Sequence, residues 1–259
     1  MKIKKLNSAQ LMERILESLN EQKPCSIVSV GQTEAVVMGQ DMFKSDPILQ
    51  GFQFHLQRET EIANKAVKEG FYHRGIRFPN PQAQQEVLEA VKAADIIGYN
   101  TLEVNAKKIT ERVFSLYNIK LNNFFEANIR RVFMKSQEEK FKQILKNRKV
   151  LLIGSLAPQA MHSLNEQYSK ELNCKIVGAI PIYEYEDIPK VKKELNNFTF
   201  DICFLSAGVN AVILAPYIAQ TFGKVAFDIG SGMKTFITNE VVTDSFIDDI
   251  IGLDHLMKM

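Results

Sequence analysis

The stretch Phe204-Leu-Ser-Ala-Gly-Val-Asn-Ala-Val-Ile-Leu-Ala215 decides the fold. Its apolar beginning predicts a buried strand, Ser206-Ala207-Gly208 predicts a tight turn, and the small and apolar residues that follow predict a helix. A helix that begins directly after a strand directs free backbone N–H groups and a partial positive charge at one point. We therefore expect this turn to bind a phosphate group.

The same alternation of strand and helix runs through residues 148–235. Continuous apolar runs predict the other strands at 149–155, 174–180 and 225–228. Helical patterns follow the strands, at 158–170, 188–195 and 209–221. This alternation is typical of βαβ units and a parallel sheet, whose ligands bind at the carboxyl ends of the strands. Small and polar residues occupy those ends in this chain, namely Ser155, Ser206, Gly208, Asp228 and Gly230.

Residues 1–147 show a different pattern, in which helices dominate. Apolar residues at helical spacing predict helices at 8–21, 58–69, 106–117 and 136–147, and another that begins at Pro81. Two short strands are predicted at 25–31 and 95–100, and residues 41–57 are predicted to be irregular. We predict one α/β domain over 1–259, with a mostly helical N-terminal half at 1–147 and a Rossmann-like parallel sheet at 148–235. A helical tail at 236–259 is expected to end in a short helix at 244–253.

The composition is that of an ordinary soluble globular protein, with 46% hydrophobic and 24% charged residues. The 32 basic and 30 acidic residues leave a net charge of +2, which is too balanced to favour a nucleic acid or an anionic membrane as partner. No apolar run approaches the roughly 18 residues of a membrane span. Cys25, Cys174 and Cys203 lie among apolar residues, as expected of core thiols in a reducing compartment. We therefore expect a cytoplasmic protein.

Polar residues also follow the two N-terminal strands. Gln32, Thr33 and Glu34 come after the first strand, and Asn100 comes after the second. This placement is typical of the edge of a pocket, but a surface turn explains it equally well. Glu34 and Asp228 are the acids of greatest interest, since both follow short apolar strands. A carboxylate at such a position could bind Mg²⁺ or Mn²⁺ bridged to a diphosphate, or orient a ribose hydroxyl.

The segment 71–80 combines aromatic residues with His73, Arg74 and Arg77. The planar forks of the two arginines suit phosphate and carboxylate groups, and His73 could act as a base. The alternative is a structured loop in which the arginines pair with nearby acids and the histidine makes structural hydrogen bonds.

Three common motifs of α/β enzymes are absent from the sequence. No Gly-x-Gly-x-x-Gly follows a strand, and neither a Walker A sequence nor a Gly-x-Ser-x-Gly elbow occurs. The residues alone therefore indicate an α/β protein that binds a small ligand containing phosphate.

The order of these motifs resembles that of the bacterial glycosyltransferase-like proteins of the GT-D fold, over about residues 20–235. Ser26-Ile-Val-Ser-Val-Gly-Gln-Thr-Glu34 matches the strand that in this family usually ends in Gly-Asp-Gly-Glu, whose Asp-x-Glu unit serves the metal and the sugar nucleotide. Residues 206–215 and 226–230 match the C-terminal mark of the family, and 73–80 matches a His-Arg-Gly-x-Arg-Phe-Pro-Asn stretch of similar members.

This resemblance implies transfer of a sugar from a nucleotide-sugar, with a UDP-sugar as the expected donor, to an acceptor of unknown identity. It implies catalytic roles for Glu34 and Asp228, with Mg²⁺ or Mn²⁺ at Glu34. The residues expected to contact the substrate are Gln32, Thr33, His73, Arg74, Arg77, Asn100, Ser155, Ser206, Gly208, Asn210, Gly230 and Ser231.

The sequence departs from the family pattern at the expected metal site. Gln32 stands in place of the first acid of Asp-x-Glu, Thr33 in place of the next glycine, and Ser231 in place of a histidine that many members carry. A site with fewer charges would bind a metal–diphosphate less well. Three hypotheses therefore stay open: a working glycosyltransferase, a protein that binds a nucleotide or sugar nucleotide without turnover, and a partner-binding protein with a vestigial pocket. The tail leaves a homo-oligomer open, because it is expected to pack on the body or on a partner.

Overall fold

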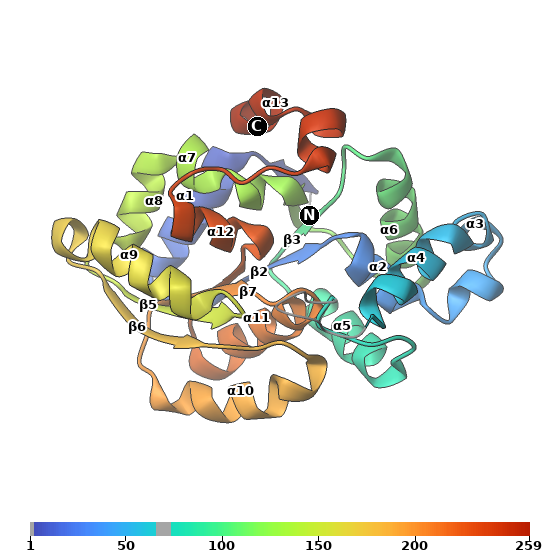
Figure 1. Ribbon diagram of the computed structural model, residues 1–259, viewed down its shortest axis with the longest axis horizontal. Coiled ribbons are helices and arrows are strands. Elements are labelled where there is room, and N and C mark those ends of the chain that lie inside the picture. Colours follow the sequence, from blue (N-terminus) through green and yellow to red (C-terminus); the bar gives the residue numbers. More distant parts are fainter. Residues whose placement is uncertain (1–2, 66–73) are drawn as a thin grey trace.

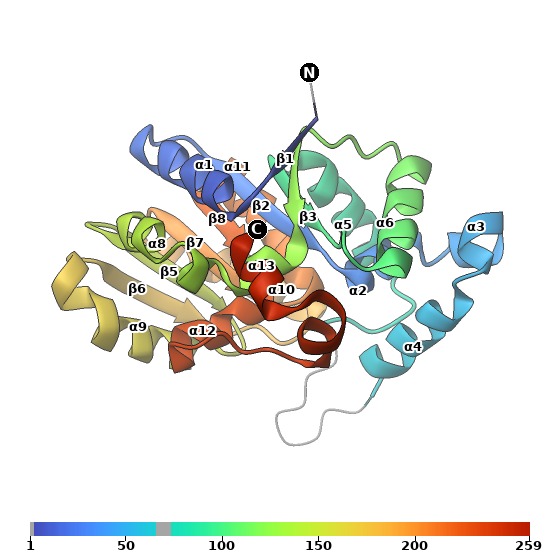
Figure 2. The same ribbon diagram turned by 90° about the horizontal axis from the view of Figure 1, so that it is seen from above.

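The computed structural model of the protein describes residues 3–65 and 74–259, so the predicted site residue His73 lies outside the described residues. One sheet of eight parallel strands has the order β1-β4-β3-β2-β8-β7-β5-β6 (Figures 1 and 2). The strands are β1 (Lys4–Leu6), β2 (Cys25–Val30), β3 (Ile96–Tyr99), β4 (Asn123–Glu126), β5 (Lys149–Gly154), β6 (Lys175–Ile180), β7 (Ile202–Ser206) and β8 (Val225–Asp228).

Helices connect the strands and cover both faces of the sheet. They are α1 (Ser8–Asn20), α2 (Gln32–Gly39), α3 (Pro47–Gln50), α4 (Gln53–Ala63), α5 (Pro81–Ala93), α6 (Val104–Leu116), α7 (Phe133–Ser136), α8 (Glu138–Leu145), α9 (Ala157–Leu172), α10 (Ile188–Glu194), α11 (Val209–Phe222), α12 (Met233–Thr238) and α13 (Leu253–Lys258). In the described part of the chain, no helix combines the length and the apolar character needed to cross a bilayer.

The sheet separates two apolar cores. Along β5, Leu151 and Ile153 point into one core, whereas Val150 and Leu152 point into the other, because successive side chains of a strand alternate between faces. The first core is closed by residues of α2, α5, α6, α10 and α11, and the second by residues of α1, α7, α8, α9 and α12. Both faces are therefore buried, which explains why the strands consist of nearly continuous apolar residues.

The centre of the sheet, between β2 and β8, determines where a ligand can bind. The chain runs outward from β2 through β3 to β4 on one side, and it reaches β8 from the other side through β7. Ile27 of β2 is paired with Phe227 of β8 at this junction. Such a switch point leaves a crevice outside the carboxyl ends of the two central strands.

The parallel sheet predicted for residues 148–235 is confirmed, but the sheet is wider than predicted. The N-terminal half contributes four of the eight strands, including β1 and β4, which were not predicted. Both are short and pair in parallel with distant residues, such as Leu6 with Phe125, so no local pattern marks them. The prediction of an irregular segment at 41–57 is wrong, because α3 and the start of α4 lie there. The helix predicted at 244–253 is a π-helical turn, Ile247–Ile251, followed by α13.

Candidate functional site

The carboxyl ends of the strands open into a main cleft of about 540 Å³. The predicted site residues that line it are Gln32, Thr33, Glu34, Arg74, Asn100, Ser206, Gly208, Gly230 and Ser231. Residues that were not predicted also line it, among them Arg58, Glu59, Asn128, Arg130, Asp244 and Phe246. The strand ends of the site were thus predictable from the sequence, whereas the side chains that converge on them from other segments were not.

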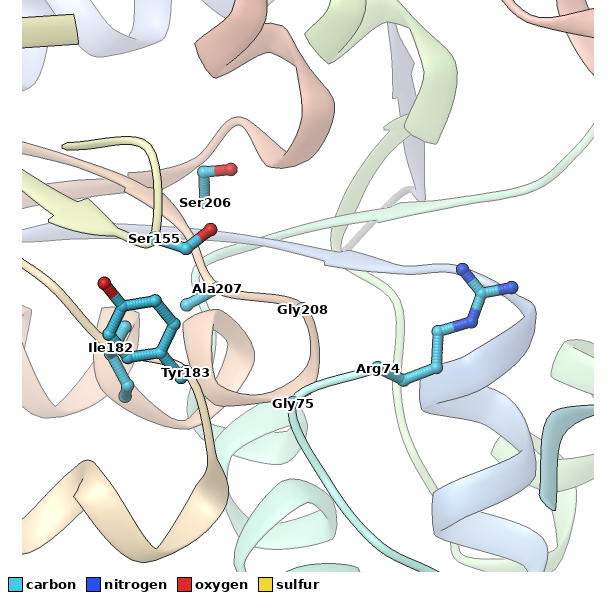
Figure 3. Close-up of a pocket in the computed structure, with 8 residues that line it drawn as sticks. All are labelled: Arg74, Gly75, Ser155, Ile182, Tyr183, Ser206, Ala207 and Gly208. Carbon is cyan, nitrogen blue, oxygen red and sulfur yellow. The ribbon is translucent and has the colours of Figure 1, made fainter. Parts of the chain in front are cut away.

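A side pocket of about 210 Å³ adjoins the main cleft at the ends of β5, β6 and β7. Arg74, Ser206 and Gly208 line both spaces. Ser155 and Tyr183 line the side pocket together with Ser206, and Figure 3 shows the side chain of Arg74 extending away from them. The two spaces together could hold a ligand with two unlike parts.

The predicted turn after β7 is pinned to the segment that carries Arg74. Gly208 has φ +56 and ψ −136, and a Cβ at this position would lie 2.6 Å from the Arg74 carbonyl oxygen. The Asn210 side-chain amide donates to the Gly75 carbonyl oxygen at 2.9 Å. Asn210 is completely buried, so the structure places it beneath the site, where it holds the two segments together.

Asp228 is not among the described residues that line the main cleft, and it is only 2% exposed. Its carboxylate accepts hydrogen bonds from the backbone N–H groups of Ser29 at 3.2 Å and Gly230 at 3.0 Å. It also forms an ion pair with Arg130, whose Nη1 lies 3.0 Å from Oδ2. Burial raises the pKa of Asp228 above its usual 3.8, and Arg130 and the two N–H groups oppose this rise because they stabilise the carboxylate.

Glu34, in contrast, lines the main cleft itself. It belongs to the first turn of α2, and its Oε2 accepts from the Gly31 backbone N–H at 2.9 Å. The side chain is buried, and burial raises the pKa of Glu34 above its usual 4.5, while the nearby Arg130 lowers it. A carboxyl group of raised pKa beside a cleft is suited to accept a proton.

A network of hydrogen bonds connects α2 with α4 and with Arg74. Glu59 is 3% exposed and accepts from the Thr33 hydroxyl at 2.7 Å and from Arg74 Nε at 3.1 Å. Gln32 Nε2 lies 2.8 Å from His55 Nδ1. The alternative interpretation, in which an arginine of segment 71–80 pairs with a nearby acid, therefore holds for Arg74. Its side chain nevertheless remains 44% exposed at the cleft wall.

The amides at the ends of β3 and β4 form a second polar wall. Buried Glu126 accepts from the Thr101 backbone N–H at 2.6 Å and from the Asn128 side-chain amide at 2.7 Å. Asn128 in turn lies 3.5 Å from the Asn100 amide oxygen.

Arg77, which was predicted to contact the substrate, is exposed to solvent. It is not among the described residues that line the main cleft or the side pocket.

The C-terminal tail reaches the rim of the main cleft, because Asp244 and Phe246 line it. Arg131 holds this segment through an ion pair with Asp244 at 3.0 Å and a hydrogen bond to the Val242 carbonyl oxygen at 3.3 Å. Residues separated by more than a hundred positions meet here, so no local sequence pattern could have identified Asp244 or Phe246.

The donor atoms around Glu34 do not suit the divalent cation that the family resemblance implies. The described residues contain no group of three or more histidine, cysteine, aspartate or glutamate side chains placed to hold a metal ion. Gln32 contributes no charge, and Asp228 already faces the guanidinium of Arg130. Mg²⁺ and Mn²⁺ favour carboxylate oxygens that are free to coordinate.

Comparisons with known proteins agree with this architecture. Among solved structures, one of the highly conserved domain of unknown function 1792, which has a distinct glycosyltransferase fold, superposes with a TM-score of 0.56. It is 12% identical in sequence, and the match covers 93% of this chain and 84% of that chain, so it shows the fold alone. No curated protein matches the sequence. The family model of the GT-D fold-like domain matches residues 6–236, and the chain therefore belongs to the GT-D-like family.

Proposed function

We propose that this protein binds a nucleotide-sugar in the main cleft and transfers the sugar to a hydroxyl group of an acceptor. One observation carries this proposal: the buried carboxyl group of Glu34 and the guanidinium of Arg130 line the same cleft at the switch point of the sheet. Direct displacement at the anomeric carbon by an acceptor hydroxyl is assisted by a base that takes the hydroxyl proton and by positive charge that stabilises the leaving diphosphate.

The size and chemistry of the site support a nucleotide-sugar as the ligand. The main cleft of about 540 Å³ falls within the usual range for small-molecule sites of ~300–1,000 Å³. The turn at 206–208 precedes the N-terminus of α11, where backbone N–H groups favour an anion. The glycosyltransferase fold makes a UDP-sugar the first donor to test.

The proposed reaction follows from the position of Glu34. The acceptor oxygen attacks the anomeric carbon of the donor sugar, and its proton passes to the Glu34 carboxylate. The bond between the anomeric carbon and the diphosphate oxygen breaks, and the diphosphate leaves with the electron pair. Asp228 is too deeply buried to contact the acceptor, so we assign it the role of orienting Arg130.

A second candidate is a protein that binds the same ligand without turning it over. The observation that favours it is Gln32, which replaces a family acid and lies against His55. In this case the cleft would keep its arginines and its turn but would lack catalytic charge.

Calorimetric titration with UDP, GDP and several UDP-sugars, followed by an assay of UDP release, distinguishes these candidates. We expect micromolar binding of UDP and release of UDP from at least one UDP-sugar in wild-type protein. Binding of UDP-sugars without any release would support the second candidate. If no nucleotide binds, both candidates are wrong.

A further inference from the structure

We propose that the guanidinium of Arg130 acts in place of a divalent cation at this site, so that the protein binds the diphosphate of its ligand without a metal. The nucleotide part of this inference rests on the proposed function, whereas the diphosphate part can be tested alone. The inference differs from what the family resemblance implies, which is a metal held by an Asp-x-Glu unit.

Arg130 is fixed in position by its ion pair. Its Nη1 lies 3.0 Å from Oδ2 of Asp228, and that carboxylate is held in turn by the N–H groups of Ser29 and Gly230. The Arg130 side chain is 20% exposed and lines the main cleft. An arginine held in this way loses little conformational entropy when it binds a ligand.

The turn after β8 is shaped around this arginine at two points. A Cβ at Gly230 would lie 2.7 Å from Cζ of Arg130, and a Cβ at Gly232 would collide with the Arg130 carbonyl oxygen. Only glycine leaves the guanidinium in its place at residue 230. The backbone of Gly230–Gly232 thus leaves room for both the guanidinium and the carbonyl group of Arg130.

The remaining donors of Arg130 are available to an anion. A guanidinium carries several N–H groups in one plane, and the bond to Asp228 uses one of them. Among the described residues, no other acceptor forms a hydrogen bond with this side chain. A phosphate group can accept two parallel hydrogen bonds from such a fork, as it would accept the coordination of a metal.

The surroundings of Arg130 disfavour a second cation. Glu34 directs Oε2 at the Gly31 N–H, Gln32 is uncharged, and the Asp228 carboxylate is already engaged in the ion pair with Arg130. A divalent ion bound among these groups would be repelled by the nearby positive charge without enough carboxylates to compensate. The fixed guanidinium and the weakened metal site therefore both indicate that the diphosphate is bound without a metal.

The test is calorimetric titration of the full-length protein with UDP, with uridine and with inorganic pyrophosphate, each in EDTA and in Mn²⁺. We expect UDP and pyrophosphate to bind in EDTA with affinities within about threefold of those in Mn²⁺. Arg130→Gln should weaken the binding of both by at least tenfold and leave uridine binding unchanged. Arg148→Gln is the matched control, because Arg148 bonds to Leu19 and Asn20 at the opposite end of the sheet.

The outcomes separate this inference from the proposed function. UDP binding that requires Mn²⁺, or that is unchanged in a folded Arg130→Gln protein, would overturn the inference and leave the proposed function standing. Pyrophosphate binding in EDTA without any binding of nucleotides would support the inference and overturn the proposed function. If Arg130→Gln does not fold, the comparison of EDTA with Mn²⁺ in wild-type protein decides the question, and Arg130→Lys, which keeps the charge but not the fork, should show intermediate affinity.

Discussion

Gly230 lies directly against the guanidinium of Arg130, and a Cβ at residue 230 would stand 2.7 Å from Cζ of the arginine. The two residues come from distant parts of the chain, one after β8 and the other after β4. Because of this contact, the guanidinium of Arg130 can keep its position in the cleft only if the turn after β8 keeps its conformation. Backbone conformation and ligand binding are therefore coupled at residue 230.

Gly230→Ala tests this coupling. The added Cβ must displace the guanidinium, and alanine at φ +47 costs roughly 1–2 kcal/mol of stability. We expect the variant to fold, to lose more stability than this backbone cost alone, and to bind UDP about tenfold more weakly. Urea denaturation and calorimetry measure the two effects.

Gly223→Ala is the matched control for that variant. Gly223 ends α11 with φ +66, and no atom lies within 4 Å of the site of its Cβ. We expect only the same backbone cost of roughly 1–2 kcal/mol and unchanged UDP affinity. Equal losses of stability and equal affinities in the two variants would show that residue 230 does not position Arg130.

Glu34→Gln tests the proposed base. The amide keeps an oxygen that can accept from the Gly31 N–H, but it cannot take a proton from the acceptor. We expect sugar transfer to fall by roughly 10²–10⁴-fold and UDP affinity to change little. Glu89→Gln serves as the control, because Glu89 is exposed on α5, accepts a hydrogen bond from Gln85 of the same helix and does not line the main cleft. Transfer that persists in Glu34→Gln would assign the base to another residue.

The pH dependence of transfer gives a separate measure of Glu34. Burial raises its pKa above 4.5, and only the deprotonated form can act as a base. We expect the rate of transfer to fall as pH drops through this raised pKa, with Asp228 contributing to the apparent value because the two carboxyl groups interact. A rate–pH profile that stays flat down to pH 4.5 would contradict this assignment.

The strand ends of the site were predictable, whereas the charges between them were not. β7 and β8 are continuous apolar runs, so the sequence locates Ser206 and Asp228 at their ends. It does not tell whether a strand-end carboxylate faces the cleft, as Glu34 does, or is taken up by neighbouring groups, as Asp228 is. That difference depends on contacts between residues about a hundred positions apart.

Arg130 shows most clearly which kind of site residue cannot be predicted from the sequence. It lies in a short 3-10 turn after β4, a strand of only four residues whose first two are half-buried, so neither element has a recognisable period. Its role arises from Asp228 and Gly230, which meet it only when β8 pairs beside β2. A sequence pattern records local preferences, and this contact depends on the assembled sheet.

Gln32→Asp tests how the metal site was weakened. The change restores the acid of the family pattern next to Glu34, and carboxylates are better ligands for Mn²⁺ than amides. We expect the variant, unlike the wild-type protein, to bind UDP at least fivefold more tightly in Mn²⁺ than in EDTA. Gln32→Asn is the control, because it has the same shape as Asp without the charge. An equal response to Mn²⁺ in the Asp and Asn variants would show that charge at residue 32 is not the missing feature.

Asp46 and Arg112 form an ion pair outside the site, and it should make stability depend on pH. Arg112 Nε lies 3.0 Å from Asp46 Oδ2, and hydrogen bonding to Arg112 lowers the pKa of Asp46 from 3.8 to about 2. Because the folded protein favours the charged carboxylate, this stabilisation is complete above about pH 4 and is lost as pH falls through about 2.

A double-mutant cycle isolates this pair from the other acids of the protein. Asp46→Asn keeps a side-chain oxygen that can accept from the N–H groups of Ile48 and Leu49 at the start of α3, so it removes the charge but not the helix cap. Arg112→Gln removes the partner. We expect the coupling free energy between the two changes, measured by urea denaturation, to be constant between pH 7 and pH 4 and to shrink as pH approaches 2. A coupling that is independent of pH throughout this range would show that the ion pair does not lower the pKa of Asp46.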